Sequence, residues 1–453
     1  MEQPKIHLTP ADKYIVRPVN KFISKSTTGG IVLFIAALIA IFFANSEWSE
    51  EYNHFWHQHI VISLGEFSLD LSLHHWINDG LMAIFFFVVG LELKRELTNG
   101  ELASPKKAML PIIAAIGGMV FPALIYTFFN NGTDAAHGWG IPMATDIAFA
   151  LGVMYLLGNK VPLPLKVFLT ALAIVDDLGA VLVIAIFYTN ELHMGYLSLG
   201  LGIFALMLFS NKMGVKSIIH YAILGIGGVW LCFLMSGVHA TIAAVLAAFT
   251  IPASARVNES YFVYKMRELR DKFLSIDPDE KHEDLTDEQI RVVEDMHELT
   301  RETIPPSQRL EHGMHSFVSF IVMPIFALCN AAIPISFDNG LSLVTIGVIL
   351  GLLLGKVLGI FGLLGALIKL KIVKKTEGLS MKNLLGVAFL ASIGFTMSLF
   401  ITELAFDTKL HPEYVPEAKM GIIIASLIGG IVGYLILNTN KEEKKEEKIF
   451  RVF

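Results

Sequence analysis

Long apolar stretches, separated mostly by short polar loops, dominate the chain. About twelve are long enough to cross a bilayer as a helix, which takes roughly 20 residues, and they centre near residues 38, 87, 117, 149, 176, 202, 225, 244, 322, 353, 391 and 427. The pattern predicts an all-α polytopic membrane protein. Its expected parts are an N-terminal segment at 1–27, eight spans at 28–251, a polar insertion at 252–308, four spans at 309–438 and a tail at 439–453.

Residues 58–75 depart from the helical pattern. Apolar and polar residues alternate there, as in Phe67, Leu69 and Leu71 with Ser68 and Asp70 between them. Alternation of period two is typical of a strand, and a two-residue turn that begins with glycine suits a type II′ hairpin. We therefore predict a small external β-hairpin around Gly65-Glu66, with an irregular loop as the alternative.

The insertion at 252–308 predicts two amphipathic helices on the cytoplasmic side. Residues on one face of the first helix are Phe262, Met266, Leu269 and Phe273. In the second, Thr286 and Gln289 form a capping-box signature before the apolar residues Ile290, Val293 and Met296. A structured linker is a better interpretation of this segment than a catalytic domain.

Composition agrees with a membrane protein: 54% of the residues are hydrophobic and 17% are charged, against about 25% charged in soluble domains. A net charge of −6 does not suggest a nucleic-acid partner. The two cysteines, Cys232 and Cys329, lie in apolar spans and are interpreted as core residues. The chain has no CxxC, HExxH or P-loop motif, so we do not predict an enzyme or a cofactor.

Lysines and arginines gather in alternate loops, which sets the orientation in the membrane. Five precede the first span, whereas residues 46–75 contain none. The loops on that second side have only Lys409 and Lys419. Both termini are therefore expected in the cytoplasm, as an even number of spans requires.

Two spans contain residues that break helices. In span four, Gly138, Gly140 and Pro142 precede the run that includes Thr145 and Asp146. In span eleven, Gly386 and Gly394 flank the polar run 392–398. Interrupted spans at corresponding positions of two halves are a sequence sign of a transporter binding site.

The adjacent aspartates Asp176 and Asp177 lie in the middle of span five. An ionised residue at mid-membrane costs about 2.5–3.5 kcal/mol on insertion scales, and such residues mark ion or proton paths. Burial and a second nearby carboxylate both disfavour ionisation, so the pair should hold at least one proton. A hard cation such as Na⁺ prefers oxygen ligands, so it would compete with that proton. A hydrogen-bonded structural pair is the alternative.

Other charged residues lie in or near the spans. Lys356, in the middle of span ten, needs a buried partner such as one of these aspartates, unless it snorkels to the interface. Asp146 is expected to supply an ion ligand or to balance helix ends, and a simple N-cap is compatible with both. A titratable cluster is predicted near the cytoplasmic ends of spans two and nine, with ordinary interfacial charge as the alternative. Its residues are Glu92, Arg95, Glu96, Glu311, His312 and His315.

Several strings, in order along nearly the whole membrane part, resemble the NhaA-type Na⁺/H⁺ antiporters of bacterial inner membranes. They are Trp76-Ile-Asn-Asp-Gly-Leu-Met82, Gly90-Leu-Glu-Leu-Lys-Arg-Glu-Leu97, Ile141-Pro-Met-Ala-Thr-Asp-Ile-Ala-Phe-Ala-Leu-Gly152, Ala171-Leu-Ala-Ile-Val-Asp-Asp-Leu-Gly179, Ser236-Gly-Val-His-Ala-Thr241, Arg309-Leu-Glu-His312 and Ile393-Gly-Phe-Thr-Met-Ser398. Two departures stand out: Ser392 replaces an expected glycine, and the 252–308 insertion is longer than usual.

The resemblance implies inverted repeats, with spans four and eleven broken and crossed. It also implies roles: Asp176 and Asp177 bind Na⁺ and H⁺ at the end of a cytoplasmic funnel, Lys356 pairs with Asp176, and Thr145 and Asp146 belong to the crossed assembly. The six residues near spans two and nine would sense pH, and the hairpin at 58–75 would join two subunits of a homodimer in the lipid bilayer.

We therefore expect an antiporter that expels Na⁺, and also Li⁺, in exchange for H⁺. A cation channel and a proton-coupled solute symporter of the same fold remain alternatives. An intramembrane aspartyl protease also uses two aspartates, but the Gly-x-Gly-Asp string of such enzymes is absent.

Overall fold

The computed structural model describes residues 26–440 except 66, 190–191, 278–283, 335–340, 372–379 and 407–409. Most of the predicted segments at 1–27 and 439–453 lie outside this range. Within it, nine helices are long and apolar enough to cross a membrane. Four are single helices: α6 (Pro105–Asn130), α8 (Leu163–Phe187), α9 (Met194–Lys212) and α21 (Tyr414–Asn438).

The other five are composite, because π-helical or 3₁₀ segments lie within them. They are α4 (Leu73–His75) with η2 (Trp76–Leu81) and α5 (Met82–Asn99); η4 (Asp134–Met143) with α7 (Ile147–Leu156); α10 (Ile218–Ala222) with η6 (Ile223–Trp230) and α11 (Leu231–Ser236); α15 (Pro306–Phe317) with η7 (Val318–Val322) and α16 (Met323–Asn330); and α17 (Leu343–Leu350) with η8 (Gly351–Gly355), η9 (Val357–Gly362) and α18 (Leu363–Lys369).

Two bent pairs raise the span count to as many as eleven. The residues after α2 (Ser26–Ala44) turn by 120° into α3 (Ser49–Trp56), and α19 (Met381–Ala391) bends by 44° into α20 (Phe395–Ala405). The remaining apolar helix, α12 (Ala240–Thr250), has 11 residues, about 16 Å at 1.5 Å per residue. That is shorter than the hydrocarbon core of a bilayer, so the predicted twelfth span stays a prediction.

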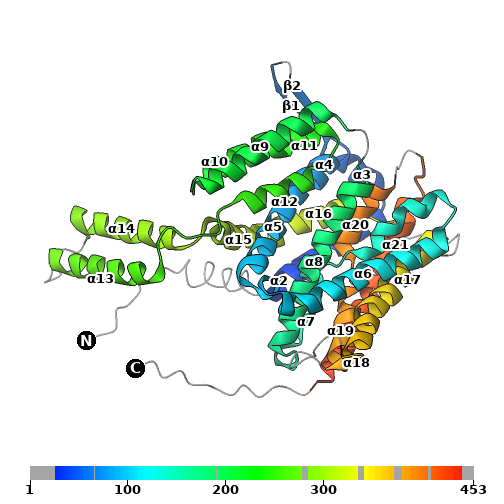
Figure 1. Ribbon diagram of the computed structural model, residues 1–453. Coiled ribbons are helices and arrows are strands. Elements are labelled where there is room, and N and C mark those ends of the chain that lie inside the picture. The colour runs from blue at the N-terminus through cyan, green and yellow to red at the C-terminus, as the bar shows by residue number, and fades with distance from the viewer. Residues whose placement is uncertain are drawn as a thin grey trace.

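The long helices pack side by side around one extended core (Figure 1). Fully buried aromatic residues mark its centre: Phe400 of α20 contacts Phe86 of α5 and Phe326 of α16, with ring centroids 5.6 and 6.3 Å apart. A second layer, formed by α9 to α11, lies against α12 and α5. Cys232 and Cys329 are free and buried, as predicted.

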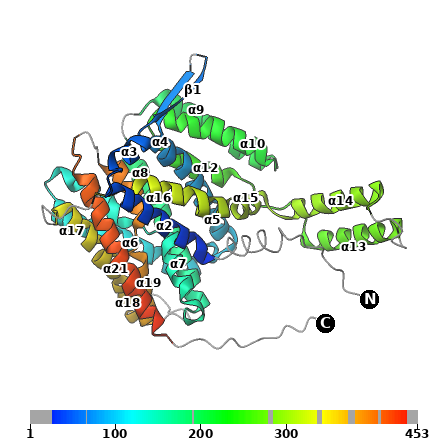
Figure 2. The same cartoon turned by 180° about the vertical axis from the view of Figure 1, so that it is seen from behind.

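The predicted β-hairpin is confirmed as a two-stranded antiparallel sheet. Strand β1 (His59–Leu64) pairs with β2 (Phe67–Ser72), and Leu64 faces Phe67 across the two-residue turn. Gly65 has φ of +63°, a left-handed conformation that suits glycine. The hairpin projects from the end of the bundle (Figure 2), and Ile60, Val61 and Ile62 of β1 are exposed.

The insertion forms the two predicted helices, α13 (Glu259–Ile276) and α14 (Asp287–Thr303), which project from the bundle as a helical hairpin (Figure 2). The capping box of Thr286 and Gln289 is present. Of the apolar residues that follow the capping box, Ile290 and Val293 are each 43% exposed. Val292, Met296 and Leu299 pack against α13, since helix pairing selects one i, i+4, i+7 row rather than every apolar residue.

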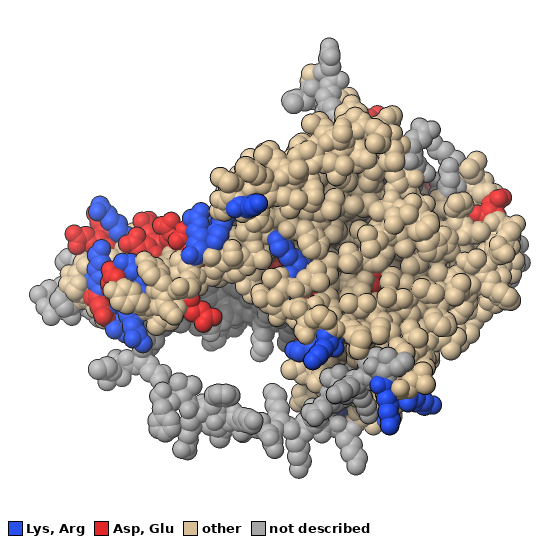
Figure 3. Space-filling model, in the orientation of Figure 1, with Lys and Arg blue, Asp and Glu red and all other residues tan. Residues whose placement is uncertain are grey.

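Surface charge separates the membrane body from the insertion. Acidic and basic side chains gather over α13 and α14 on the face shown in Figure 3, whereas a broad part of the bundle has neither. The protein is therefore a multi-pass membrane protein. Lys419, which we placed in a loop, lies instead within α21, 8% exposed and 2.7 Å from the carboxylate of Glu403.

Candidate ion-binding site

Two interrupted helices meet in the middle of the bundle. Residues 144–146 separate η4 from α7, and residues 392–394 separate α19 from α20. The backbone N–H of Asp146 donates to the carbonyl oxygen of Ile393 at 2.7 Å. The Thr145 hydroxyl oxygen lies 2.9 Å from the carbonyl oxygen of Ala391, and the Ser398 hydroxyl donates to the carbonyl of Ile141 at 2.8 Å. Each break thus satisfies polar backbone groups of the other, as irregular backbone at membrane depth requires.

The Asp146 carboxylate connects the two interrupted helices. It accepts hydrogen bonds from the backbone N–H of Phe149 at 2.9 Å, which makes it the N-cap of α7. It also accepts from the backbone N–H and the hydroxyl of Thr396, at 3.1 and 2.5 Å, in the first turn of α20. A negative charge near the N-termini of two short helices is favourable, because each N-terminus has a partial positive charge.

Asp176 lies on the intact helix α8 and is almost completely buried. Its Oδ2 atom accepts from Lys356 Nζ at 2.5 Å and from the Thr145 hydroxyl at 2.7 Å. The predicted partner of Lys356 is thus one of the two aspartates. Oδ1 of Asp176 has no hydrogen-bond partner among the described residues.

Asp177 differs sharply from its neighbour. Its side chain is fully buried, and both carboxylate oxygens have no hydrogen-bond partner among the described residues. The charged groups that act on it include Asp176, Asp146, Glu92 and Lys356. The pair therefore offers three unpartnered carboxylate oxygens, and oxygen is the ligand type that hard cations prefer.

Lys356 is held by a close crossing of two helices. It lies between η8 and η9, is fully buried, and also donates to the carbonyl of Met143 at the end of η4. A Cβ atom on Gly117 of α6 would lie 2.2 Å from the carbonyl oxygen of Gly359. Only glycine permits this approach, which places α6 against the lysine-bearing segment.

The structure brings together five of the six residues predicted to sense pH. Arg95 of α5 forms ion pairs with Glu311 of α15 and, at 3.1 Å, with Glu96. His315 Nδ1 lies 3.8 Å from Glu92 Oε1. His312 is exposed, and no ion pair among the described residues includes it. The cluster connects α5 to α15, directly after the insertion.

Comparisons with known proteins show the family of the chain. The family described as Na⁺/H⁺ antiporter 1 matches residues 20–437. This chain belongs to that family. A protein from Wolinella succinogenes named Na(+)/H(+) antiporter NhaA is 48% identical over 94% of each chain. Relatives from Saccharophagus degradans (46%; 95% of this chain and 93% of the relative) and Helicobacter pylori strain HPAG1 (45%; 92% and 94%) have the same kind of name.

In this member of the Na⁺/H⁺ antiporter 1 family, Ser392 is accommodated at the second break by a glycine. Its hydroxyl donates to the carbonyl of Phe389 at 2.6 Å and lies 2.0 Å from where a Cβ on Gly429 of α21 would be. The bulk of Ser392 is therefore compatible with the break.

Sequence reasoning missed some polar residues of the site and of its surroundings. Thr396 and Ser398 lay inside the polar run that we noted, but their partners depend on the tertiary structure. Glu403 gave the same signal as Lys356, a charge in an apolar span, and was overlooked. It pairs with Lys419 and lies 3.7 Å from His74.

No group of three or more histidine, cysteine, aspartate or glutamate side chains arranged to hold a metal ion occurs in the described part of the chain. The predicted Na⁺ ligands Asp176 and Asp177 would hold a transported ion rather than a resident metal.

Proposed function

We propose that the protein exchanges cytoplasmic Na⁺, and also Li⁺, for external H⁺ by competition at Asp176 and Asp177. The observation behind this proposal is the fully buried carboxylate of Asp177, which has no hydrogen-bond partner among the described residues. Membership of the Na⁺/H⁺ antiporter 1 family and the names of the relatives support the same activity.

An ionised, unpartnered carboxylate in a buried site is unfavourable by several kcal/mol. A proton removes the charge, and a bound cation compensates it. The site is therefore stable when it holds either ligand and unstable when it is empty. A site that opens to one membrane face at a time would then release one ligand only by accepting the other, which is exchange.

Asp176 has a different role in this scheme. Lys356 and Thr145 already satisfy its Oδ2 atom, whereas Oδ1 is available to share a cation with Asp177. Binding of a cation would compete with the ammonium group of Lys356 for the charge of Asp176. Lys356 thus couples the ion site to η4, where it donates to Met143.

The arrangement of helices is proposed to follow the inverted-repeat scheme. Counting each bent pair as one span and the short α12 as the eighth gives twelve spans. Spans three to five then correspond in order to spans ten to twelve, with the broken spans in the middle of each set. Both termini would lie in the cytoplasm of a bacterial inner-membrane protein.

Two further parts of the proposal concern regulation and assembly. The cluster of Glu92, Arg95, Glu96, Glu311, His312 and His315 would set the pH at which exchange begins, because histidine changes charge near neutral pH. The exposed edges of β1 and β2 would pair with a second subunit, because an open strand edge is a template for further pairing.

The test is cation-induced dequenching of a pH-sensitive dye in everted membrane vesicles over several pH values. Asp177→Asn keeps the shape of the side chain but cannot lose a proton, so we expect exchange to disappear while expression and folding persist. Asp295→Asn, on the exposed surface of α14, is the matched control. Na⁺-driven proton movement at the wild-type level in Asp177→Asn would overturn the mechanism, and flux that cannot run uphill would favour a channel.

A further inference from the structure

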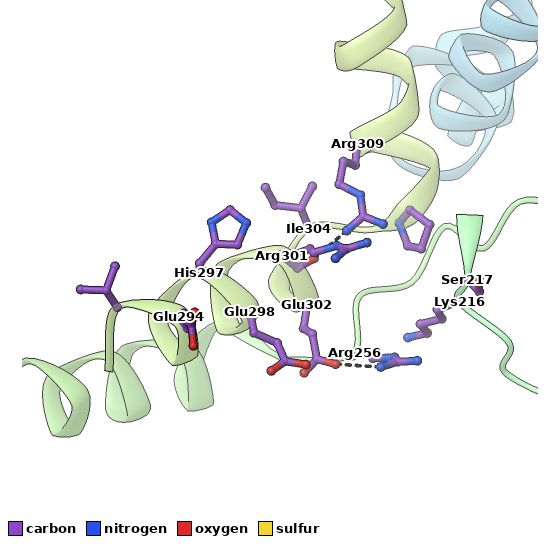
Figure 4. Close-up of a pocket in the computed structure, with 12 residues that line it drawn as sticks. Lys216, Ser217, Arg256, Glu294, His297, Glu298, Arg301, Glu302, Ile304 and Arg309 are labelled. Carbon is purple, nitrogen blue, oxygen red and sulfur yellow. Dashed lines mark hydrogen bonds and ion pairs between the residues drawn. The ribbon is translucent and has the colours of Figure 1, made fainter. Parts of the chain in front are cut away.

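A cavity of about 620 Å³ lies where the projecting helical hairpin joins the membrane body. Its walls come from four places: α14, the start of α15, the segment that contains Lys216, and the segment that contains Arg256 (Figure 4). The volume is within the range of about 300–1,000 Å³ that is typical of small-molecule sites. No part of the exchange mechanism uses this cavity.

The charges around the cavity are separated. Arg256 pairs with Glu302 at 2.7 Å, and Glu298 extends to the same side (Figure 4). Arg301 and Arg309 lie together on the other side, with Arg309 Nη1 3.4 Å from the carbonyl oxygen of Arg301. Neither of these two guanidinium groups has a carboxylate partner among the described residues.

Two adjacent guanidinium groups repel each other unless an anion lies between them. Each presents a planar fork of donors that matches phosphate oxygens in a bidentate manner. Two forks together can bind all the free oxygens of a phosphate, which are three in a monoester and two in a diester. Val293 and Ile304, 43% and 40% exposed, add an apolar wall beside the charges.

We propose that this cavity binds a phosphate-bearing organic anion through Arg301 and Arg309. The apolar wall would contact the organic part, and the two guanidinium groups would hold the phosphate. A soluble phosphate compound and a lipid headgroup both have this chemistry, and the experiment below separates them.

The segments just before and just after the helical hairpin both contact α5, at neighbouring residues. Lys94 donates to the carbonyls of Phe249 and Ile251 at the end of α12, just before the insertion. Arg95 pairs with Glu311, two residues after Arg309 on α15. The bound anion would therefore act on the Arg95–Glu311 pair. This regulatory consequence rests on the proposed function, whereas the binding itself does not.

Binding is tested with the full-length protein in phosphatidylcholine nanodiscs, titrated with ADP and with inorganic pyrophosphate. We expect the Arg301→Gln/Arg309→Gln variant to bind ADP at least about tenfold more weakly, because charged hydrogen bonds are lost. Arg291→Gln, an exposed arginine of α14 outside the cavity, should bind like the wild type. Arg301→Lys keeps the charge but not the fork, so it should also weaken binding, and it serves if the double variant does not fold.

Nanodiscs that contain phosphatidylglycerol distinguish the two sources. If the wild-type protein binds ADP in phosphatidylcholine discs but not in discs that contain phosphatidylglycerol, the lipid headgroup is the occupant. The proposal is overturned if neither ADP, pyrophosphate nor phosphatidylglycerol shows binding that depends on these arginines, or if Arg291→Gln weakens binding equally. Exchange measured in parallel separates the two proposals: arginine-dependent binding in a protein without exchange would refute only the proposed function.

Discussion

Replacing Lys356 with methionine should destabilise the protein strongly. Lys356 Nζ lies 2.5 Å from Asp176 Oδ2, and the two side chains are 0% and 1% exposed. At an effective dielectric constant of about 20, their attraction is about 7 kcal/mol before the cost of removing them from water. Methionine keeps most of the volume of the lysine stem, so the main effect is an uncompensated carboxylate at Asp176. Loss of one partner of a buried ion pair costs about 3–5 kcal/mol.

One contact of the structure, one further variant and the pH make this expectation more specific. The Thr145 hydroxyl still donates to Asp176 in the variant, so the loss should fall near the lower end of that range. The double variant Lys356→Met/Asp176→Asn removes both charges and should recover part of the loss. Protonation of Asp176 also removes the orphan charge, so the deficit of Lys356→Met should shrink as the pH falls.

The assay is thermal unfolding in detergent with a dye that fluoresces when it reacts with thiols. Cys232 and Cys329 are 8% and 6% exposed, so they react only as the fold opens. Lys212→Met, at the exposed C-terminal end of α9, is the control. Equal melting temperatures for Lys356→Met and Lys212→Met would refute the buried pair, as would a double variant that is no more stable than Lys356→Met.

Three more predictions concern the surroundings of the site. Asp146→Ala should lower the free energy of unfolding by at least the ~0.5–2 kcal/mol of a lost N-cap, measured by the same thiol assay. Asp146→Asn should lose less because its side chain retains an acceptor, and equal losses would argue against the cap. Gly359→Ala should lower both stability and exchange, because its Cβ would lie 2.1 Å from the carbonyl oxygen of Gly117. Gly362→Ala meets open space and should be tolerated. Similar behaviour of the two variants would contradict the close crossing of α6 and η9. Neutralising the charged cluster of α5 and α15 should move the pH midpoint of exchange in the dye assay while the maximal rate stays largely intact. An unchanged midpoint would leave these residues as interfacial charge. The combined variant is Glu92→Gln, Glu311→Gln, His312→Gln and His315→Gln.

Sequence alone determined the membrane class and the polar centre of this protein. Long apolar stretches leave few alternatives to helices, because backbone polar groups in lipid must be satisfied within the segment. Charges are so unfavourable at that depth that Asp176, Asp177 and Lys356 stood out without any structure. The hairpin turn and the capping box were also legible, because both depend on residues that are close in sequence.

Tertiary structure decided which of these residues meet. Lys356 pairs with Asp176, whereas Asp177 has no hydrogen-bond partner among the described residues. This difference depends on the orientation of α8 and on the close approach of glycines between α6 and η9. The same is true of Thr396 on Asp146 and of Lys419 on Glu403, contacts between residues that lie far apart or on separate helices. The buried face of α14 was decided in the same way. A helix with apolar residues on more than one side has several possible faces, and only the partner helix selects one.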